Sequence, residues 1–384
     1  MKISIVLGLG FGDEGKGATV NALCTDPKNT VVVRFNGGHQ VGHTVVNDDG
    51  VHNIRHAFSN FGSGTLKGVV TYWSEYCTVN PSAVKKEGDI LRALGIEPIV
   101  YYNANAMVTT PYDIYRNAND PNNKLHGTVG VGFGATIQRN EDMYHLYVRD
   151  LMYPKIRDMK LTAIHQYVCR QINANATLFT KGFDKYVQDF KSACEDLVHR
   201  YTIVDNFDAL QVYDTDLIFE GGQGIMLDMD YGLYPNVTRS NTTSKNAVEL
   251  ITKWGMTTRF INTYYVTRAY QTRHGNGPMT NEGMDISYIE PNPHETNVDT
   301  GSQGAFRKSV LDLDLLSYAL SCDRYYRLDA VKKNLVITCM DQVGERVPVT
   351  TFEDKLLSLT PKEIGHWLSI SNVYTSNSDK GIVI

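Results

Sequence analysis

Short runs of apolar and β-branched residues alternate along the chain with glycine-rich turns and longer helical stretches. The runs cover residues 2–7, 30–35, 99–102, 217–219, 260–266 and 335–338. Runs of this length and composition predict strands that are buried on both faces. A helical stretch follows the first run, from about residue 16 to 24, and residues 160–200 show helical periodicity with few breakers. The alternation predicts an α/β fold, with a large, mostly parallel central sheet and helices on both faces.

Nothing in the sequence divides the chain into parts. Its 384 residues contain no internal repeat, no low-complexity tract and no linker rich in Pro, Gly or Ser. We therefore expect a single domain over residues 1–384, in which additional helices and loops elaborate the sheet.

Composition narrows the class of protein. The chain has 37 basic and 42 acidic residues, for a net charge of −5, a balance that argues against proteins that coat nucleic acids or bind membrane surfaces. Its six cysteines are scattered and form no Cys-x-x-Cys pair, as is typical of a reduced compartment without structural disulfides. No apolar run is long enough to predict a transmembrane helix. We expect a cytoplasmic protein (in the host cytoplasm if the source is viral) with neither a nucleic-acid nor a membrane partner.

A glycine-dense turn after the first predicted strand is the strongest local signal of chemistry. Residues 8–17 read G-L-G-F-G-D-E-G-K-G, and such a turn at a helix N-terminus can surround a phosphate with backbone N–H groups. The part from Gly10 to Lys16 fits G-x-x-x-x-G-K, but Gly17 stands where a Walker A loop has the Ser or Thr that holds Mg²⁺. We predict a P-loop-like nucleotide site in which Asp13, inside the turn, is the candidate magnesium ligand.

A second glycine-rich segment follows the second predicted strand. Residues 36–44 read N-G-G-H-Q-V-G-H-T, at the edge of the sheet where α/β folds bind their ligands. His43 in this segment can donate to a developing oxyanion or to a phosphoryl group in transfer. The pair His39 and His43 lacks a third ligand nearby, so a zinc site is not expected.

Two later segments are rich in hydrogen-bonding groups that a core does not need. Residues 127–136 read G-T-V-G-V-G-F-G-A-T and suggest a flexible anion-binding loop with Thr128 as a hydroxyl donor. Residues 219–243 follow another predicted strand and include Gln223 and Thr238, which suit a phosphate or a sugar.

Together these segments resemble the signatures of the adenylosuccinate synthetase family. The family's G-D-E-G-K-G, G-H-T, G-T-x-G-x-G-x-G and E-G-x-Q-G…D-x-D-x-G-x-Y-P-x-V-T-x-S-N-T-T occur in this order and at about the family's spacing. A further segment, T-R-H-G-N-G-P at residues 272–278, is similar to the family's T-R-x-G-x-G-P. The resemblance covers residues 1 to about 345.

The resemblance implies a ligase. The family joins L-aspartate to C6 of a 6-oxopurine nucleotide, in the first place inosinate (IMP), and uses GTP and Mg²⁺. By resemblance, Asp13 takes the N1 proton of the purine, and the purine O6 then attacks the γ-phosphoryl group. His43 stabilises the group in transfer, Lys16 neutralises phosphate charge, and the aspartate amine finally displaces phosphate from C6.

The resemblance also implies a set of residues for each ligand. Nucleoside triphosphate contacts fall on Gly12, Glu14, Gly15, Lys16, Gly17, Ala18, Gly42, His43, Thr44, Asp341 and Ser376. Purine monophosphate contacts fall on Asp13, Gln40, Thr128, Val129, Gln223, Thr238 and His274. Aspartate contacts fall on Thr300, Gly301 and Arg307, and Mg²⁺ is implied at Asp13 and the Gly42 carbonyl. The resemblance further implies a homodimer.

The chain departs from the family at several of these positions. Val129 replaces a threonine, and Met143 stands where the family has an arginine that reaches across the dimer; Arg139 and Arg149 are the candidates to replace it. The family's arginine-rich aspartate loop keeps only Arg307 and Lys308 as cations. Asp341 can still read guanine, but Cys339 replaces the lysine that stacks on the base, so ATP remains an alternative to GTP.

Three alternatives stay open at this point. Divergent, phage-type relatives use deoxyguanylate (dGMP) and make the 2-amino product; some of them carry serine at the position of Asp13, so the retained Asp13 favours inosinate. The glycine loops alone would also suit a nucleotide-binding regulator without ligase activity, although such a protein needs neither Asp13 nor His43. A carboxylate-activating, amide-forming ligase would leave residues 220–243 without a purpose.

Overall fold

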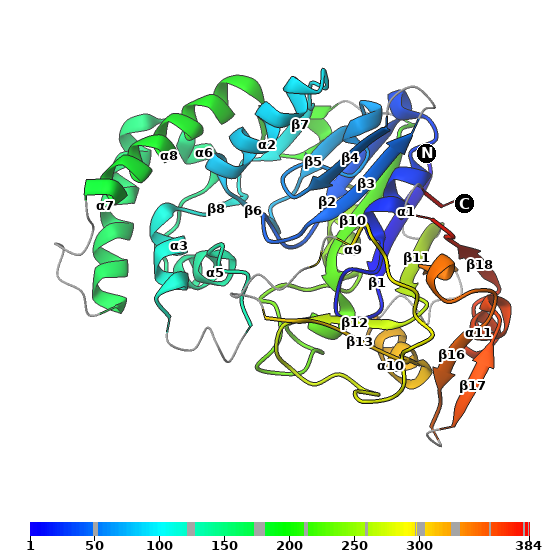
Figure 1. Cartoon of the computed structure of the whole chain (residues 1–384). Helices are drawn as coiled ribbons and strands as arrows, with labels where there is room; N and C mark the ends of the chain where they lie inside the picture. The colour runs from blue at the N-terminus through cyan, green and yellow to red at the C-terminus, as the bar shows by residue number, and fades with distance from the viewer. Residues whose placement is uncertain are drawn as a thin grey trace.

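The centre of the molecule is a nine-stranded sheet in the order β18-β15-β11-β1-β10-β2-β5-β7-β9, in which all neighbouring strands run parallel (Figure 1). The computed structural model describes residues 1–48, 53–120, 127–172, 181–210, 214–257, 260–295, 297, 304–323, 331–352, 355–378, 381, 382 and 384. The strands of the sheet are β1 (Ile3–Gly8), β2 (Thr30–Arg34), β5 (Val70–Trp73), β7 (Val100–Asn103), β9 (Thr202–Val204), β10 (Asp216–Gly224), β11 (Ile261–Arg268), β15 (Lys332–Thr338) and β18 (Asn372–Thr375). The predicted α/β class with a parallel sheet is confirmed.

All six strands predicted from the apolar runs are present, as β1, β2, β7, β10, β11 and β15. The pattern missed the other three strands. β9 has three residues, of which one is buried, and the four residues of the edge strand β18 are all half-buried. β5 is a four-residue strand interrupted by a threonine. Strands this short, or this exposed, do not give the continuous apolar run that identifies a central parallel strand.

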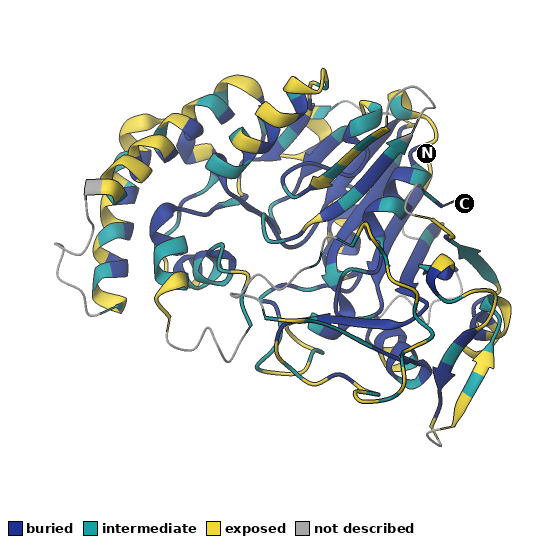
Figure 2. Ribbon diagram, in the orientation of Figure 1, coloured by how far each residue is buried: buried dark blue, intermediate teal, exposed yellow. Residues whose placement is uncertain are grey.

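Helices cover both faces of the sheet, as predicted. Successive side chains of a strand point to opposite faces, so Val6 of β1 packs with Val20 of the first helix while Ile5 and Leu7 pack on the other side. Figure 2 shows the strands of the sheet as the buried centre of the molecule. The first face carries α1 (Lys16–Leu23), and the second carries α9 (Lys245–Lys253), α10 (Leu313–Cys322) and α11 (Pro361–Trp367).

A group of helices lies beside the β7 end of the sheet (Figure 1), and most of them share one apolar core with side chains of β5 and β7. The helical periodicity of residues 160–200 corresponds to two of them, α7 and α8, and this prediction is confirmed. The group consists of α2 (Pro81–Ala93), α3 (Pro111–Ala118), α5 (Phe133–Glu141), α6 (Val148–Leu151), α7 (Pro154–Gln171) and α8 (Lys181–Arg200). No helix among the described residues is long and apolar enough to span a membrane.

Short strands and 3₁₀ turns complete the fold. The short strands form the pairs β3 (His43–Asp48) with β4 (Asn53–Phe58), β6 (Thr78–Val79) with β8 (Met107–Val108), and β12 (Gln271–His274) with β13 (Phe306–Ser309), and the set β14 (Leu311–Asp312), β16 (Val347–Thr350) and β17 (Leu356–Leu359). The 3₁₀ turns are η1 (Pro27–Asn29), η2 (Thr65–Lys67), η4 (Phe207–Leu210), η5 (Ile225–Leu227) and η7 (Met340–Gln342).

The parallel arrangement brings distant segments of the sequence to one edge. The residues that follow β1, β2, β10, β11, β15 and β18 all leave the sheet at its carboxyl edge. Ligands of open α/β sheets bind at this edge. Three of the four segments identified in the sequence, residues 8–17, 36–44 and 219–243, therefore meet in space.

Candidate active site

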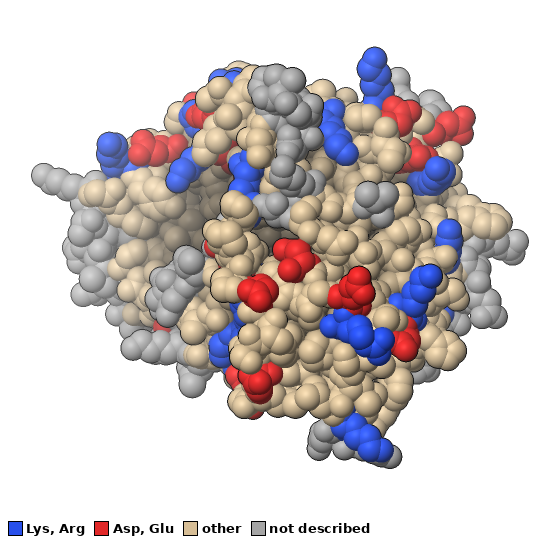
Figure 3. Space-filling view, turned by 45° about the vertical axis from the view of Figure 1, so that its right-hand side comes forward, with Lys and Arg blue, Asp and Glu red and all other residues tan. Residues whose placement is uncertain are grey.

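A cavity of about 1170 Å³ opens at the carboxyl edge of the sheet. Acidic and basic side chains are interspersed around the hollow on the face that Figure 3 shows. Every residue predicted to bind a nucleotide or magnesium lines this cavity: Gly12, Asp13, Glu14, Gly15, Lys16, Gly17, Ala18, Gln40, Gly42, His43, Thr44, Thr128, Val129, Gln223, Thr238, His274, Asp341 and Ser376.

The residues predicted to hold aspartate are not brought together in the same way. Thr300 and Gly301 lie outside the described residues. Arg307 lies in β13 and does not line the cavity: its Nη2 donates to the carbonyls of Gly275 (2.8 Å) and Gly277 (2.7 Å), and it forms an ion pair with Glu282. These contacts of the Arg307 guanidinium hold the turn at residues 275–277 in place.

Glu14 holds the glycine-rich turn in shape. Its Oε1 accepts hydrogen bonds from the backbone N–H groups of Gly10 (3.1 Å) and Gly12 (2.8 Å), and its Oε2 forms an ion pair with Lys16. Both charged side chains are buried, at 3% exposure. A buried ion pair needs such additional hydrogen bonds to be tolerated. Lys16 is thereby held in the cavity wall, where a phosphate can share it with Glu14.

Gly17 explains why this turn departs from a Walker A loop. A Cβ at this position would lie 2.8 Å from the Cβ of His43 and 3.0 Å from the Oγ of Ser63. The first distance is far below van der Waals contact, so a serine or threonine would push His43 out of place. The absence of the usual magnesium-binding hydroxyl is therefore a consequence of the close approach of α1 to His43.

His43 is oriented by a carboxylate behind it. Its Nδ1 lies 2.6 Å from Oε1 of Glu220, and Glu220 also accepts hydrogen bonds from the N–H (3.1 Å) and the hydroxyl of Ser63. Glu220 belongs to β10 and is fully buried. A carboxylate on Nδ1 leaves Nε2 to face the cavity, and Nε2 is buried without a hydrogen-bond partner among the described residues.

The charges around this pair keep Glu220 ionised. Burial by itself would raise the pKa of Glu220, but the His43 ring, the Arg34 guanidinium and the hydrogen bonds from His43 and Ser63 together lower it to about 2. Burial lowers the pKa of His43, and Glu220 opposes this effect. An anionic ligand near Nε2 would favour the imidazolium form, so a bound polyphosphate would draw a second proton onto the ring.

Asp13 presents a carboxyl group of raised proton affinity to the cavity. Its backbone has a positive φ of 64°, and its carbonyl accepts a hydrogen bond of 2.6 Å from Nε of Arg268. Arg268 also pairs with Glu295 at 2.8 Å. Burial raises the pKa of Asp13, while Arg268 and Lys16 oppose the rise. Aspartate tolerates the left-handed conformation better than most residues, which fits its place inside a tight turn.

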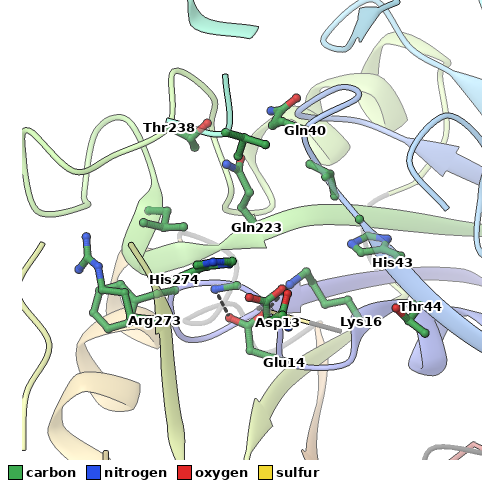
Figure 4. Close-up of a pocket in the computed structure, with 18 of the residues that line it drawn as sticks. Asp13, Glu14, Lys16, Gln40, His43, Thr44, Gln223, Thr238, Arg273 and His274 are labelled. Atoms are coloured by element: carbon green, nitrogen blue, oxygen red, sulfur yellow. Dashed lines mark hydrogen bonds and ion pairs between the residues drawn. The ribbon is translucent and has the colours of Figure 1, made fainter. Parts of the chain in front are cut away.

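Uncharged polar groups lie on another side of the cavity. Figure 4 shows Gln40, Gln223 and Thr238 together, across from Asp13 and Lys16. Both amide atoms of Gln40 and Oε1 of Gln223 are buried and have no partner among the described residues. Buried amides are nearly always hydrogen-bonded. Their free atoms indicate a polar ligand that supplies the missing bonds.

Asp341 and Ser376 lie at a further part of the cavity wall. β15 and β18 pair in parallel with Ile337 opposite Thr375, and Asp341 and Ser376 follow these two strands directly. Asp341 is exposed to the cavity, whereas the hydroxyl of buried Ser376 donates to the carbonyl of Ser378 at 2.8 Å. From this position the carboxylate of Asp341 can accept hydrogen bonds from a base.

Neither candidate replacement for the arginine missing at Met143 lines the cavity. Arg139 is fully buried, and its Nε donates to Asp113 at 2.8 Å, so it has a structural role within the chain. Arg149 pairs with Asp205 at 3.4 Å. Arg239, next to Thr238 in the sequence, does line the cavity. Its guanidinium donates to Gln138 (2.6 Å) and Glu141 (2.6 Å).

Sequence reasoning assigned no role to Glu220, Arg268 or Arg239. Glu220 had a detectable signal, since it is a lone acidic residue at the end of an apolar strand. Arg268 and Arg239 had none, because their partners lie far away in the sequence.

The sequence model of the adenylosuccinate synthetase family matches residues 5–377. The chain belongs to the adenylosuccinate synthetase family. The adenylosuccinate synthetase of Clostridium beijerinckii is 31% identical over 335 residues, which cover 83% of this chain and 75% of that protein. The enzyme of Proteus mirabilis is 29% identical over 391 residues, which cover 97% and 86%. The chain is accordingly a ligase of this family.

Two solved structures share the fold. The fully ligated adenylosuccinate synthetase of Plasmodium falciparum has a TM-score of 0.76 at 18% identity and covers 100% of this chain and 99% of that one. A cyanophage S-2L succinoaminodeoxyadenylate synthetase, bound to dGMP and dATP, has a TM-score of 0.65 at 15% identity and covers 99% and 93%. Both comparisons confirm the large parallel sheet.

Replacing Gly17 tests the close approach of α1 to His43. We expect Gly17→Ala to lower the free energy of unfolding by about 1–3 kcal/mol, the usual cost of overpacking. Gly134→Ala is the matched control, because both glycines are the second residue of a helix that follows a left-handed glycine, and a Cβ on Gly134 meets only ordinary contact at 3.6 Å. Urea unfolding measures both; equal stabilities of the two variants would contradict the prediction.

Replacing Glu220 tests its buried charge. Because the pKa of Glu220 is lowered from its ordinary value of 4.5 to about 2, its ionised form stabilises the folded state above pH 4.5, and this contribution is lost as the pH falls towards 2. We expect Glu220→Gln to lower the free energy of unfolding at pH 7 by about 1.5–3 kcal/mol, the range for hydrogen bonds to a charged group. The difference should narrow below about pH 4.5; a deficit that is independent of pH would exclude an ionised Glu220.

Proposed function

We propose that this chain joins L-aspartate to C6 of a 6-oxopurine nucleoside monophosphate and uses GTP and Mg²⁺ to do so. One observation carries the proposal: a carboxylate of raised pKa (Asp13), a buried lysine (Lys16) and a histidine with a free Nε2 (His43) line a single nucleotide-sized cavity. A protein that only binds nucleotides needs no such group of acid–base residues.

The carbonyl oxygen at C6 is a poor leaving group, so an amine does not displace it directly. Phosphorylation of this oxygen makes it a good leaving group. Asp13 accepts the N1 proton of the purine, and the electrons that remain place negative charge on O6. O6 then attacks the γ-phosphorus, and the bond from that phosphorus to the β-phosphate oxygen breaks and releases GDP. The aspartate amine adds to C6 and loses a proton to solvent, the C6–O bond breaks, and inorganic phosphate leaves with the former O6.

Each residue has a separate part in these steps. The Asp13 carboxylate, which lines the cavity, acts as the base towards N1. Lys16 and the N–H groups of the turn neutralise the phosphates. Nε2 of His43 faces the group in transfer, where an imidazolium stabilises developing charge without reorganisation. Glu220 keeps this ring in one orientation.

Hard oxygen ligands in the cavity fit Mg²⁺. The Asp13 carboxylate and the Gly42 carbonyl would hold the ion, which typically takes one or two protein oxygens and completes its shell with phosphates and water. When bound, the ion would neutralise charge on the phosphates of the donor. Among the described residues, no cluster of three or more His, Cys, Asp or Glu side chains could hold a metal ion by itself.

We also propose how the two nucleotides are held. The purine monophosphate contacts Gln40, Gln223 and Thr238, with its phosphate near Thr128. Arg239, beside Thr238, supplies within one chain the positive charge that the family takes from the arginine missing at Met143. The triphosphate lies along the glycine-rich turn with its base at Asp341, which can accept from N1 and N2 of guanine but finds no such donors on adenine.

Residues 1–384 would act as one catalytic domain, since elements from both ends of the chain line the same cavity. A homodimer is proposed from the family relationship. The sequence makes inosinate the first candidate substrate and guanylate or deoxyguanylate the second. These nucleotides differ from inosinate at C2 or also in the sugar, so the side chain opposite C2 decides between them.

A substrate panel tests the ligase proposal. Inosinate, guanylate and their deoxy forms are each offered with aspartate, Mg²⁺ and either GTP or ATP, and ultraviolet difference spectra report the new C6–N bond. We expect turnover of at least one of them, with phosphate released only when both aspartate and the purine monophosphate are present. Hydrolysis of GTP that needs neither would instead identify a nucleotide-binding regulator.

Replacing the acid–base residues tests their roles. Asp13→Asn and His43→Ala should each lower kcat by at least ~10³-fold, the scale for losing one preorganised electrostatic partner. Asp13→Asn should melt at no lower temperature than the wild type at pH 7, because it removes a carboxylate whose ionised form burial disfavours. Near-normal turnover of either variant would refute the assignment.

Replacing Asp341 tests the choice of phosphoryl donor. If Asp341 reads guanine, kcat/KM for GTP exceeds that for ATP in the wild type, and Asp341→Ala lowers the value for GTP by roughly 10-fold or more, as for one lost hydrogen bond to a charged group. The value for ATP should change much less. An equal effect on both donors would place the base elsewhere.

A further inference from the structure

His274 stands at a fixed place in the cavity wall. It is the last residue of β12, paired with Phe306 of β13, and the two rings meet edge to face with their centroids 5.9 Å apart. The preceding residue, Arg273, is buried: its Nη1 donates to the carbonyl of Pro278 at 2.5 Å, and its guanidinium lies 4.2 Å from the ring centroid of Phe11 in the glycine-rich turn. These contacts lock the end of β12 against the turn that carries Asp13.

The Nε2 atom of His274 is shielded from solvent and has no hydrogen-bond partner among the described residues. His274 lines the same cavity as the nucleotide-binding residues. A buried ring nitrogen that can donate or accept a hydrogen bond costs free energy when it stays unpaired. Its free nitrogen therefore points to a bound group that completes it.

The neighbours of His274 indicate which group this is. His274 and Lys16 both interact electrostatically with Asp13, and Lys16 interacts likewise with His43. Figure 4 shows the same succession across the cavity, with Asp13 between His274 and His43. The reacting edge of a 6-oxopurine has a matching succession of O6, N1 and C2. With N1 at Asp13 and O6 towards Lys16 and His43, the substituent on C2 faces His274.

We propose that Nε2 of His274 accepts a hydrogen bond from the 2-amino group of the purine, and that the nucleotide this chain prefers is therefore of the guanylate type. This inference rests on the proposed orientation of the purine in the ligase site. Asp13 cannot make the distinction, because inosinate and guanylate both carry the N1 proton. Inosinate has only hydrogen on C2, so it cannot supply this hydrogen bond to Nε2. Sites built to hydrogen-bond a substrate group discriminate strongly against analogues that lack it.

The test is equilibrium binding of inosinate and guanylate, which share the same sugar and phosphate, without aspartate or triphosphate. We expect the wild type to bind guanylate at least about tenfold more tightly than inosinate, as for one buried hydrogen bond. His274→Val removes the acceptor and should bring the ratio close to one. His274→Gln, whose amide oxygen can still accept, should restore part of the preference.

The matched control is His294→Val, which makes the same exchange at an exposed histidine on another part of the cavity wall and should keep the full preference. Equal affinities in the wild type, a ratio that His274→Val leaves unchanged, or binding of neither nucleotide would each overturn the inference. The inference would also be overturned if His274→Val changed only the KM for aspartate and left purine binding unaltered. A clear binding preference without turnover of any substrate would refute the ligase proposal and leave the role of His274 standing.

Discussion

Two carboxylates buried at the carboxyl edge of the sheet determine the shape of this site. The side chains of Glu14 and Glu220 are almost inaccessible to solvent. An unpaired carboxylate in such a place would be strongly destabilising. Glu14 is compensated by Lys16 and the N–H groups of the glycine-rich turn, and Glu220 by His43 and Ser63. Each compensation also positions a group that faces the cavity. The chemistry of the site thus follows from satisfying charges that the fold has buried.

The packing also explains which parts of the fold and of the site could be predicted from the sequence. The central strands were predictable because a parallel strand between two helical layers must be apolar throughout, and the phosphate-binding turn because close approaches such as that of Gly17 to His43 admit only glycine. The short strand β9 and the edge strand β18 lack that pattern. The roles of Arg139 and Arg307 were not predictable, because each is decided by a distant partner, Asp113 or Glu282, that no local spacing reveals.

The departures from the family fall on recognition more than on chemistry. Asp13, Lys16 and His43 are present and line one cavity. The side-chain amides of Gln40 and Gln223, which lack partners among the described residues, line it as well. The changes lie around them: Met143 stands where the family has the arginine that reaches across the dimer, and Cys339 stands where it has the stacking lysine.

The central claim is that the purine oxygen itself receives the phosphoryl group before aspartate displaces it. The most direct measurement uses a purine monophosphate labelled with ¹⁸O at position 6, whichever the enzyme turns over, and mass spectrometry of the inorganic phosphate released with the aspartyl product. The account predicts that each phosphate carries one ¹⁸O atom from the purine. Unlabelled phosphate, with the ¹⁸O recovered in water, would show that O6 leaves without being phosphorylated and would contradict it.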